Sequence, residues 1–271
     1  MHGKWPWLAV RWGVVILALL ATLFPFYWTA TLATQQTAAA FGTPRFLYAP
    51  DFGAFAEVWQ NSDFLASLLM SLATVVTTVI LTLLVTLPAA FALTRYQVRA
   101  RSTLVGWLLI AYLLPDFLLA IPMFALLQNI GLYDTPWGLA LTYQVFMIPL
   151  AMWLLLRFFQ EVPMELAEAA SIDGAGGLKT LILIYLPIVR PGIGTTAILI
   201  AVNIWNEATI SLSLTLNNPT VPIAVAAYRG YAAIQWNQLA AASLFAMAPV
   251  AIFALFAQRY IVAGLTAGIG K

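Results

Sequence analysis

The stretch FLASLLMSLATVVTTVILTLLVTLPAAFAL, residues 64–93, runs without a single charged side chain. A helix needs about 20 apolar residues to cross the hydrocarbon core of a bilayer. This stretch is longer than that, so we expect a membrane-spanning helix that tilts or protrudes from the bilayer. It therefore places the chain among the integral membrane proteins.

The composition supports this class, because 63% of the 271 residues are hydrophobic and only 8% are charged. Soluble domains are about half apolar and about a quarter charged. The net charge of +2, spread over few residues, does not suit a surface that follows nucleic-acid phosphates. The chain has no cysteine and a single histidine, His2, which excludes thiolate chemistry and leaves no basis for histidine chemistry. We expect no catalytic residue, no metal and no nucleic-acid partner.

Five further stretches are long and apolar enough to cross a bilayer. The first is longer than the apolar region of a secretory signal, so we interpret it as a spanning helix. We expect an all-α integral membrane protein with a core domain over residues 64–262 and two notable outer loops, 33–63 and 217–238. The six predicted spans cover residues 12–32, 64–93, 103–127, 137–158, 192–216 and 239–262.

Lysine and arginine are distributed unevenly between the two sides of the predicted bundle. Ten of the twelve lie near the termini or around the second and fourth loops, whereas the alternate loops hold only Arg45 and Arg229. Such an excess marks the cytoplasmic side. We therefore expect both termini, residues 1–11 and 263–271, and the loop 159–191 in the cytoplasm.

The inner loop contains EAASIDGAGG, residues 168–177, an unusual run of acids and small residues in so apolar a chain. Pro163 suits the start of a helix, and Glu165 and Glu168 suit its positive end. Gly174 is expected to end it, because a residue without a Cβ readily adopts the left-handed conformation. The loop therefore predicts two short helices separated by a turn.

Two interpretations of the first short helix are open. A helix that lies on the bilayer surface usually carries bulky apolar residues on one face and Lys or Arg on the other. This helix carries acids and alanines instead. Since small residues allow close backbone approach, docking into a groove of another protein is favoured over docking on lipid.

The spacing of the inner loop resembles the EAA motif of importer permeases in the ATP-binding-cassette superfamily. Three other segments resemble the sugar branch of that family, in particular the second permease of maltose-type systems: residues 89–101, 129–141 and 205–215. The ending, residues 258–271, resembles that branch except in its last few residues. The matched motif is Glu168-Ala169-Ala170, three residues, Gly174, nine residues, Ile184, one residue, and Leu186-Pro187.

This resemblance implies a type-I importer permease fold and a transport subunit rather than an enzyme. The implied partners are a second permease in a heterodimer, two cytoplasmic ATPases, an external solute-binding protein and the lipid bilayer. ATP and Mg would bind the ATPase subunits, and this chain would bind no cofactor. The implied substrate is a di- or oligosaccharide or a related polyol, carried by alternating access.

In that family the inner loop is the coupling helix, which seats in a cleft of the ATPase. By resemblance, Glu168 anchors the helix at the cleft rim, Ala169 and Ala170 pack closely against the ATPase, and Gly174 makes the turn. The full set of coupling residues is Glu165, Glu168, Ala169, Ala170, Gly174, Leu186 and Pro187.

The chain carries no ATP site of its own. A phosphate-binding loop needs Gly-Lys-Ser/Thr at the end of a glycine-rich turn. The segment GAGGLKT, residues 174–180, places Leu178 between the glycine and Lys179. ATP hydrolysis is therefore expected on separate subunits.

Polar residues inside the predicted spans are candidates for the translocation pathway, because such groups are costly at membrane depth and tend to face cavities or partners. A purely structural role, as polar packing or as partners for backbone freed by proline, is the alternative. The absence of Lys and Arg deep in the spans argues mildly against an anionic substrate but does not exclude one, because a partner permease could hold the whole substrate site. The candidates are Asp116, Asn203, Asn206 and Glu207.

The last outer loop offers candidates for contact with the external binding protein. Its aromatic residues could equally be interfacial residues of the bilayer. The candidates are Asn217, Asn218, Tyr228, Arg229 and Tyr231.

Two other functions stay open. An importer permease for glycerophosphate-type compounds or polyamines would share the coupling loop. A secondary transporter would use carboxylates such as Asp116 and Glu207 for ion coupling. The inner-loop motif disfavours the secondary transporter, since the motif has no task without an ATPase.

Overall fold

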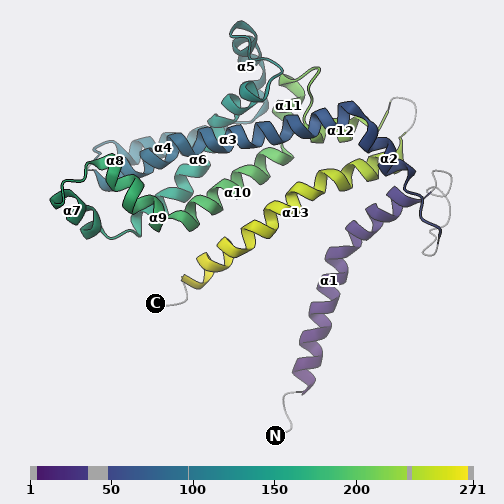
Figure 1. Ribbon diagram of the computed structural model, residues 1–271, viewed down its shortest axis with the longest axis horizontal. Coiled ribbons are helices and arrows are strands. Elements are labelled where there is room, and N and C mark those ends of the chain that lie inside the picture. Colours follow the sequence, from purple (N-terminus) through teal and green to yellow (C-terminus); the bar gives the residue numbers. More distant parts are fainter. Residues whose placement is uncertain (1–4, 36–47, 97, 231–233, 268–271) are drawn as a thin grey trace. The chain divides into compact units, whose positions relative to one another are not determined.

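The computed structural model describes residues 5–35, 48–96, 98–230 and 234–267, and every regular element in these ranges is helical. The prediction of an all-α protein is therefore confirmed. The elements are α1 (Trp5–Thr34), α2 (Gly53–Gln60), α3 (Ser62–Arg95), α4 (Arg101–Tyr112), α5 (Phe117–Asn129), α6 (Pro136–Gln160), α7 (Met164–Ile172), α8 (Gly177–Thr180), the π-helix η1 (Leu181–Tyr185), α9 (Leu186–Ile188), α10 (Arg190–Asn206), α11 (Thr209–Leu214), α12 (Val221–Ala227) and α13 (Trp236–Ala267) (Figure 1).

Four helices are long and apolar enough to cross a membrane as single pieces: α1, α3, α6 and α13. Two further pairs pass the same test but are bent, by 95° between α4 and α5 and by 79° between the helix ending at Ile188 and α10. If each bent pair is one span, the total is six. The 95° bend lies inside the predicted span 103–127, which is therefore a broken helix, whereas the 79° bend comes just before the predicted span 192–216 begins.

Proline accompanies two of the interruptions, and a third divides the predicted span 192–216. Pro115 lies between α4 and α5 and has no N–H to donate into a continuous helix. The predicted span 192–216 ends early, because α10 stops at Asn206 and a new helix, α11, begins at Thr209. The π-helix η1 comes just before Pro187, where the missing N–H and the proline ring disturb regular helical bonding.

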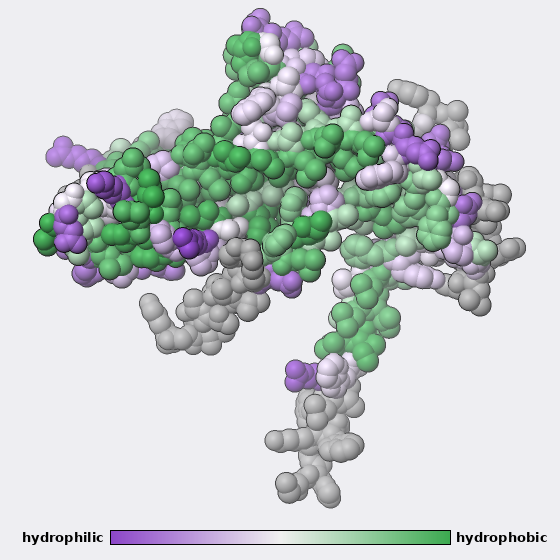
Figure 2. Space-filling model, viewed as in Figure 1, coloured by the Kyte–Doolittle hydropathy of each residue, from purple (hydrophilic) through white to green (hydrophobic). Residues whose placement is uncertain are grey.

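The chain divides into two compact units, residues 1–65 with 224–248, and residues 66–223 with 249–271. In the first unit, aromatic rings of α2 and the start of α3 gather on Phe245 of α13: Phe55, Trp59 and Phe64. The side-chain amide of Asn237 donates to the carbonyl of Gln35. Residues 10–28 of α1 are all exposed and mostly apolar, as expected for a helix that faces lipid (Figure 2).

In the second unit, α6 contacts both α4 and α10 and supplies much of the buried core. Its 25 residues span about 37 Å at 1.5 Å per residue, enough to cross a bilayer. The inner-loop helices lie at one end of α6 and α11 lies at the other (Figure 1). The second unit therefore contains both the inner-loop helices and α11.

Helix α3 packs in the second unit through a row of buried hydroxyl side chains. Each of four threonines donates to a carbonyl four residues earlier, and Thr82 also donates to Oε1 of Gln144 on α6, at 2.9 Å. Small side chains with internally satisfied hydroxyls allow helices to approach closely inside a membrane. The row comprises Ser67, Ser71, Thr74, Thr78, Thr82 and Thr86.

Candidate functional site

Helix α7 ends in a glycine turn, as the sequence predicted. Gly174 has φ +77°, in the left-handed region. Its N–H donates to the carbonyl of Ser171 at 3.1 Å, and the N–H of Ala175 donates to the carbonyl of Ala170 at 2.9 Å. This pair of bonds is a Schellman motif, which satisfies the last carbonyls of a helix and reverses the chain. Pro163 lies one residue before the helix, as its N-cap.

The two faces of α7 differ in exposure. Ala167 and Ala170 are buried inside the chain, whereas Glu165, Glu168 and Ala169 are exposed. Ala170 therefore contributes to packing within the loop, and the exposed small residue beside Glu168 is Ala169. An acidic, small-residue face is left open on this helix.

Exposed apolar side chains border this acidic face. Ile172 at the end of α7 is 86% exposed and Leu178 on α8 is 70% exposed. Leu166 on α7 is also exposed. Isolated apolar side chains are common on protein surfaces, but these three on one short inner loop are consistent with a surface that another protein covers.

The inner loop is joined to the spanning helices through aromatic contacts. Tyr185 is buried, and its ring meets Phe91 of α3 edge-on at 4.9 Å and stacks with Phe159 of α6 at 5.9 Å. Gly177 lies against Tyr96, where an added Cβ would come within 2.6 Å of the tyrosine oxygen. Of the predicted coupling residues Leu186 and Pro187 that follow Tyr185, the first is half-buried and the second exposed. These contacts pack the inner loop against α3 and α6.

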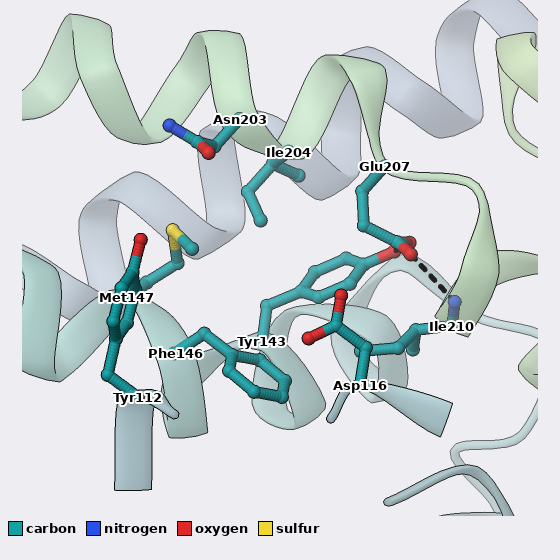
Figure 3. A pocket seen from close by; sticks show the side chains of 9 residues that line it. All are labelled: Tyr112, Asp116, Tyr143, Phe146, Met147, Asn203, Ile204, Glu207 and Ile210. Carbon is teal, nitrogen blue, oxygen red and sulfur yellow. Dashed lines mark hydrogen bonds between the residues drawn. The ribbon is translucent and has the colours of Figure 1, made fainter. Parts of the chain in front are cut away.

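A cavity of about 250 Å³ lies where the broken spans meet α6. It is built at the α4–α5 bend and at the gap between α10 and α11 (Figure 3). Broken helices in transporters often form binding sites near the middle of the membrane, since their ends offer free backbone groups. The lining residues are Tyr112, Asp116, Tyr143, Phe146, Met147, Asn203, Ile204, Glu207 and Ile210.

Glu207 holds together the gap between α10 and α11. Its Oε2 accepts hydrogen bonds from the Tyr143 hydroxyl at 2.5 Å and from the Ser211 N–H at 3.2 Å. Its Oε1 accepts from the Ile210 N–H at 2.7 Å (Figure 3). The carboxylate thus caps the first turn of α11, whose N-cap, Ala208, has no side-chain acceptor.

The other three pathway candidates are placed differently. Asp116 and Asn203 line the cavity, and Asp116 is exposed at the N-cap of α5. Asn206 is not among the lining residues, and its amide donates to the carbonyl of Val202 at 2.7 Å. The structure therefore brings three of the four candidates together and leaves Asn206 outside.

The predicted binding-protein contacts fall into two groups. Asn217 and Asn218 are exposed and lie beside Asp134, which accepts backbone hydrogen bonds from both. Tyr228 is half-buried, and its ring meets Phe64 edge-on. Arg229 is exposed, and Tyr231 lies outside the described residues.

Asp134 was not anticipated from the sequence as a site residue. It has φ +60°, uncommon for a residue other than glycine, and its Oδ1 also accepts from the N–H of Leu216 at 2.9 Å. The Asp-Thr-Pro run could have suggested a turn, because Asp tolerates the left-handed conformation. Tyr143, in a predicted span, and Tyr185, in the predicted inner loop, were also missed, since a single tyrosine carries no distinguishing pattern.

Comparison with known proteins agrees with this geometry. A family model described as "Binding-protein-dependent transport system inner membrane component" matches residues 84–267. The "Trehalose/maltose transport system permease protein MalG" of Thermococcus litoralis is 31% identical over 96% of this chain and 95% of its own length. The "Trehalose transport system permease protein SugB" of Mycobacterium tuberculosis is 31% identical over 97% of this chain and 98% of its own.

A solved structure shares the fold. The crystal structure of a bacterial ABC transporter "involved in the import of the acidic polysaccharide alginate" superposes with a TM-score of 0.76. It is 21% identical, over 96% of this chain and 98% of that one. The family model matches most of the chain, and two relatives are 31% identical over nearly all of it. The chain therefore belongs to the family of inner-membrane components of binding-protein-dependent transport systems, as a multi-pass transport component rather than an enzyme.

Proposed function

We propose that the chain is one permease of an ATP-driven importer for a di- or oligosaccharide or a related polyol. The observation that carries the proposal is the exposed α7–α8 surface, with its EAA spacing, glycine turn and open acidic face. The trehalose and maltose permeases that are similar over nearly the whole chain support the sugar class. The pathway between the two sides opens by alternating access.

The partners of this chain are a second permease, two ATPases that bind ATP and Mg, and an external solute-binding protein. Residues Glu165, Glu168 and Ala169 seat α7 in a cleft of the ATPase, and the exposed Leu166, Ile172 and Leu178 cover its rim. Closure of the ATPases moves α7, and the buried Tyr185 passes that movement to α3 and α6. The cavity at the broken spans contributes one wall of the pathway.

The test is ATPase activity of the purified complex in proteoliposomes. The external binding protein is loaded with maltose, with trehalose, or with no sugar, and ATP hydrolysis and sugar uptake are measured together. We expect at least one loaded form to stimulate both. Stimulation by a glycerophosphate or a polyamine, and by neither sugar, would contradict the sugar assignment, and uptake without ATP would contradict the importer.

A further inference from the structure

The cavity at the broken spans contains two carboxylates with different surroundings. Both oxygens of Glu207 are engaged, by the Tyr143 hydroxyl and by two backbone N–H groups of α11. Asp116 has no such partners: over the part of the chain that the structure describes, no donor is hydrogen-bonded to its side chain, and although it is the N-cap residue of α5, its carboxylate makes no capping bond. The Glu207 carboxylate therefore stabilises the fold, whereas the Asp116 carboxylate is open to the cavity.

A free carboxylate at membrane depth is costly unless it faces water or a ligand. Asp116 and Asn203 line the same cavity, and the rings of Tyr112 and Phe146 also line it (Figure 3). Carboxylate and amide oxygens accept hydrogen bonds from hydroxyl groups, while aromatic rings cover apolar faces. This combination of side chains suits a polyhydroxylated ring.

The charged residues that line the cavity are all acidic. Its nine lining residues include two acids and neither Lys nor Arg. Two like charges in a partly enclosed space raise the free energy of an anion there, because the effective dielectric constant is lower than in water. The volume, about 250 Å³, lies just below that of typical ligand pockets (about 300–1,000 Å³), as expected for one wall of a pathway that a second permease completes.

We infer that Asp116 is the substrate-facing acceptor of this cavity, that Glu207 is its structural carboxylate, and that the cavity selects neutral hydroxylated solutes over anionic ones. The inference rests on the proposed function, since it takes the cavity as part of the pathway. It separates this chain from the fold-related importer of an acidic polysaccharide.

Because the chain has no cysteine, a single thiol can report on the cavity. The Asn203→Cys variant is expressed with its partner subunits, and membrane vesicles are treated with a cationic (trimethylammonium-ethyl) or an anionic (sulfonatoethyl) methanethiosulfonate. Modification of this chain is followed by mass spectrometry. We expect the cationic reagent to react faster and Asp116→Asn to lower the cation-to-anion rate ratio about tenfold. Glu207→Gln should lower the cation-to-anion rate ratio less, because both oxygens of that carboxylate already accept hydrogen bonds from three groups of the protein.

Protection of the Asn203→Cys thiol tests the ligand class, with maltose, trehalose and the anionic analogue maltobionate as probes. We expect protection by a neutral sugar, weaker protection by maltobionate, and loss of protection in Asp116→Asn. Protection by maltobionate as strong as by maltose, protection by none of the three, or an unchanged rate ratio in Asp116→Asn would overturn the inference. Labelling requires neither ATP nor the inner loop, so this result is independent of the ATPase test of the importer.

Discussion

The inner loop and the cavity are both built where helices stop, but they stop for different reasons. At the inner loop, α7 ends through its own backbone, with Gly174 at φ +77° and two local hydrogen bonds. At the cavity, α10 ends at Asn206, and α11 is capped by Glu207, which Tyr143 of α6 holds from 64 positions away. One break is local and the other depends on tertiary contacts.

This difference predicts which properties substitutions in each region should impair. A local turn can be altered without disturbing the spans, so changes in the inner loop should separate assembly from transport. A tertiary cap ties three helices together, so changes at Glu207 should affect stability as well as transport. The variants below test this contrast.

The largest effect is expected for Glu168→Lys, which reverses a charge on the open face of α7. Breaking a charge-assisted contact in a desolvated interface costs about 2–5 kcal/mol, so ATP-driven uptake should fall roughly thirtyfold or more. The chain should still insert, because Glu168 lies outside the spans. Uptake into proteoliposomes and co-purification of the ATPase measure the two properties.

Glu165→Lys is the matched control, since it places the same charge change on the same helix, in its first turn. Its effect should be milder. If Glu168→Lys inserts, assembles and transports at the wild-type rate, the coupling role of α7 is wrong.

Gly174→Val should come next in size. A β-branched residue at φ +77° strains the backbone by about 1–3 kcal/mol, which would misdirect the turn and lower uptake about fivefold to a hundredfold. Gly176→Val is the control, because Gly176 has φ −68° and open space where the Cβ would go. Equal uptake by the two variants would show that the turn geometry does not matter for coupling.

The inner loop could be predicted from the sequence because its geometry depends on residues that are close together in the chain. The end of α7 at Gly174, the helix that follows and the exposure of Glu168 all follow from residues within one loop. The spanning helices could be placed for a related reason, since about 20 apolar residues in a row have few alternatives in a membrane.

The cavity could not be predicted in the same way. Asp116 and Glu207 were recognised as costly residues in spans, but nothing in the sequence says that a 95° bend brings Asp116 into the cavity that Glu207 also lines. Nor could the sequence show that the Tyr143 hydroxyl donates a hydrogen bond to Glu207, or that Asn206 does not line the cavity. These facts depend on which helices pack together, and single polar residues do not encode that.

Glu207→Gln should have a moderate effect, and on stability first. The amide keeps one acceptor but turns a donor toward the N–H of either Ile210 or Ser211, which bind different carboxylate oxygens, and leaves that part-buried N–H unsatisfied. We expect the free energy of unfolding to fall by about 1–3 kcal/mol. Thermal denaturation of the solubilised complex measures this, with Asp116→Asn as the control that should leave the melting temperature unchanged. An equal loss of stability in both variants would remove the distinction between the two carboxylates.

The smallest effects are expected for two asparagines on α10. Asn203 and Asn206 are both exposed, and each donates to a carbonyl four residues earlier, so their local roles are matched. Only Asn203 lines the cavity. Asn203→Ala should lower uptake about threefold to tenfold, the value of one hydrogen bond to a solute, whereas Asn206→Ala should change it less than about twofold. Initial uptake rates at equal amounts of assembled complex make the comparison. If Asn206→Ala costs as much as Asn203→Ala, the solute passes along a different face of α10, and the cavity at the broken spans is not its route.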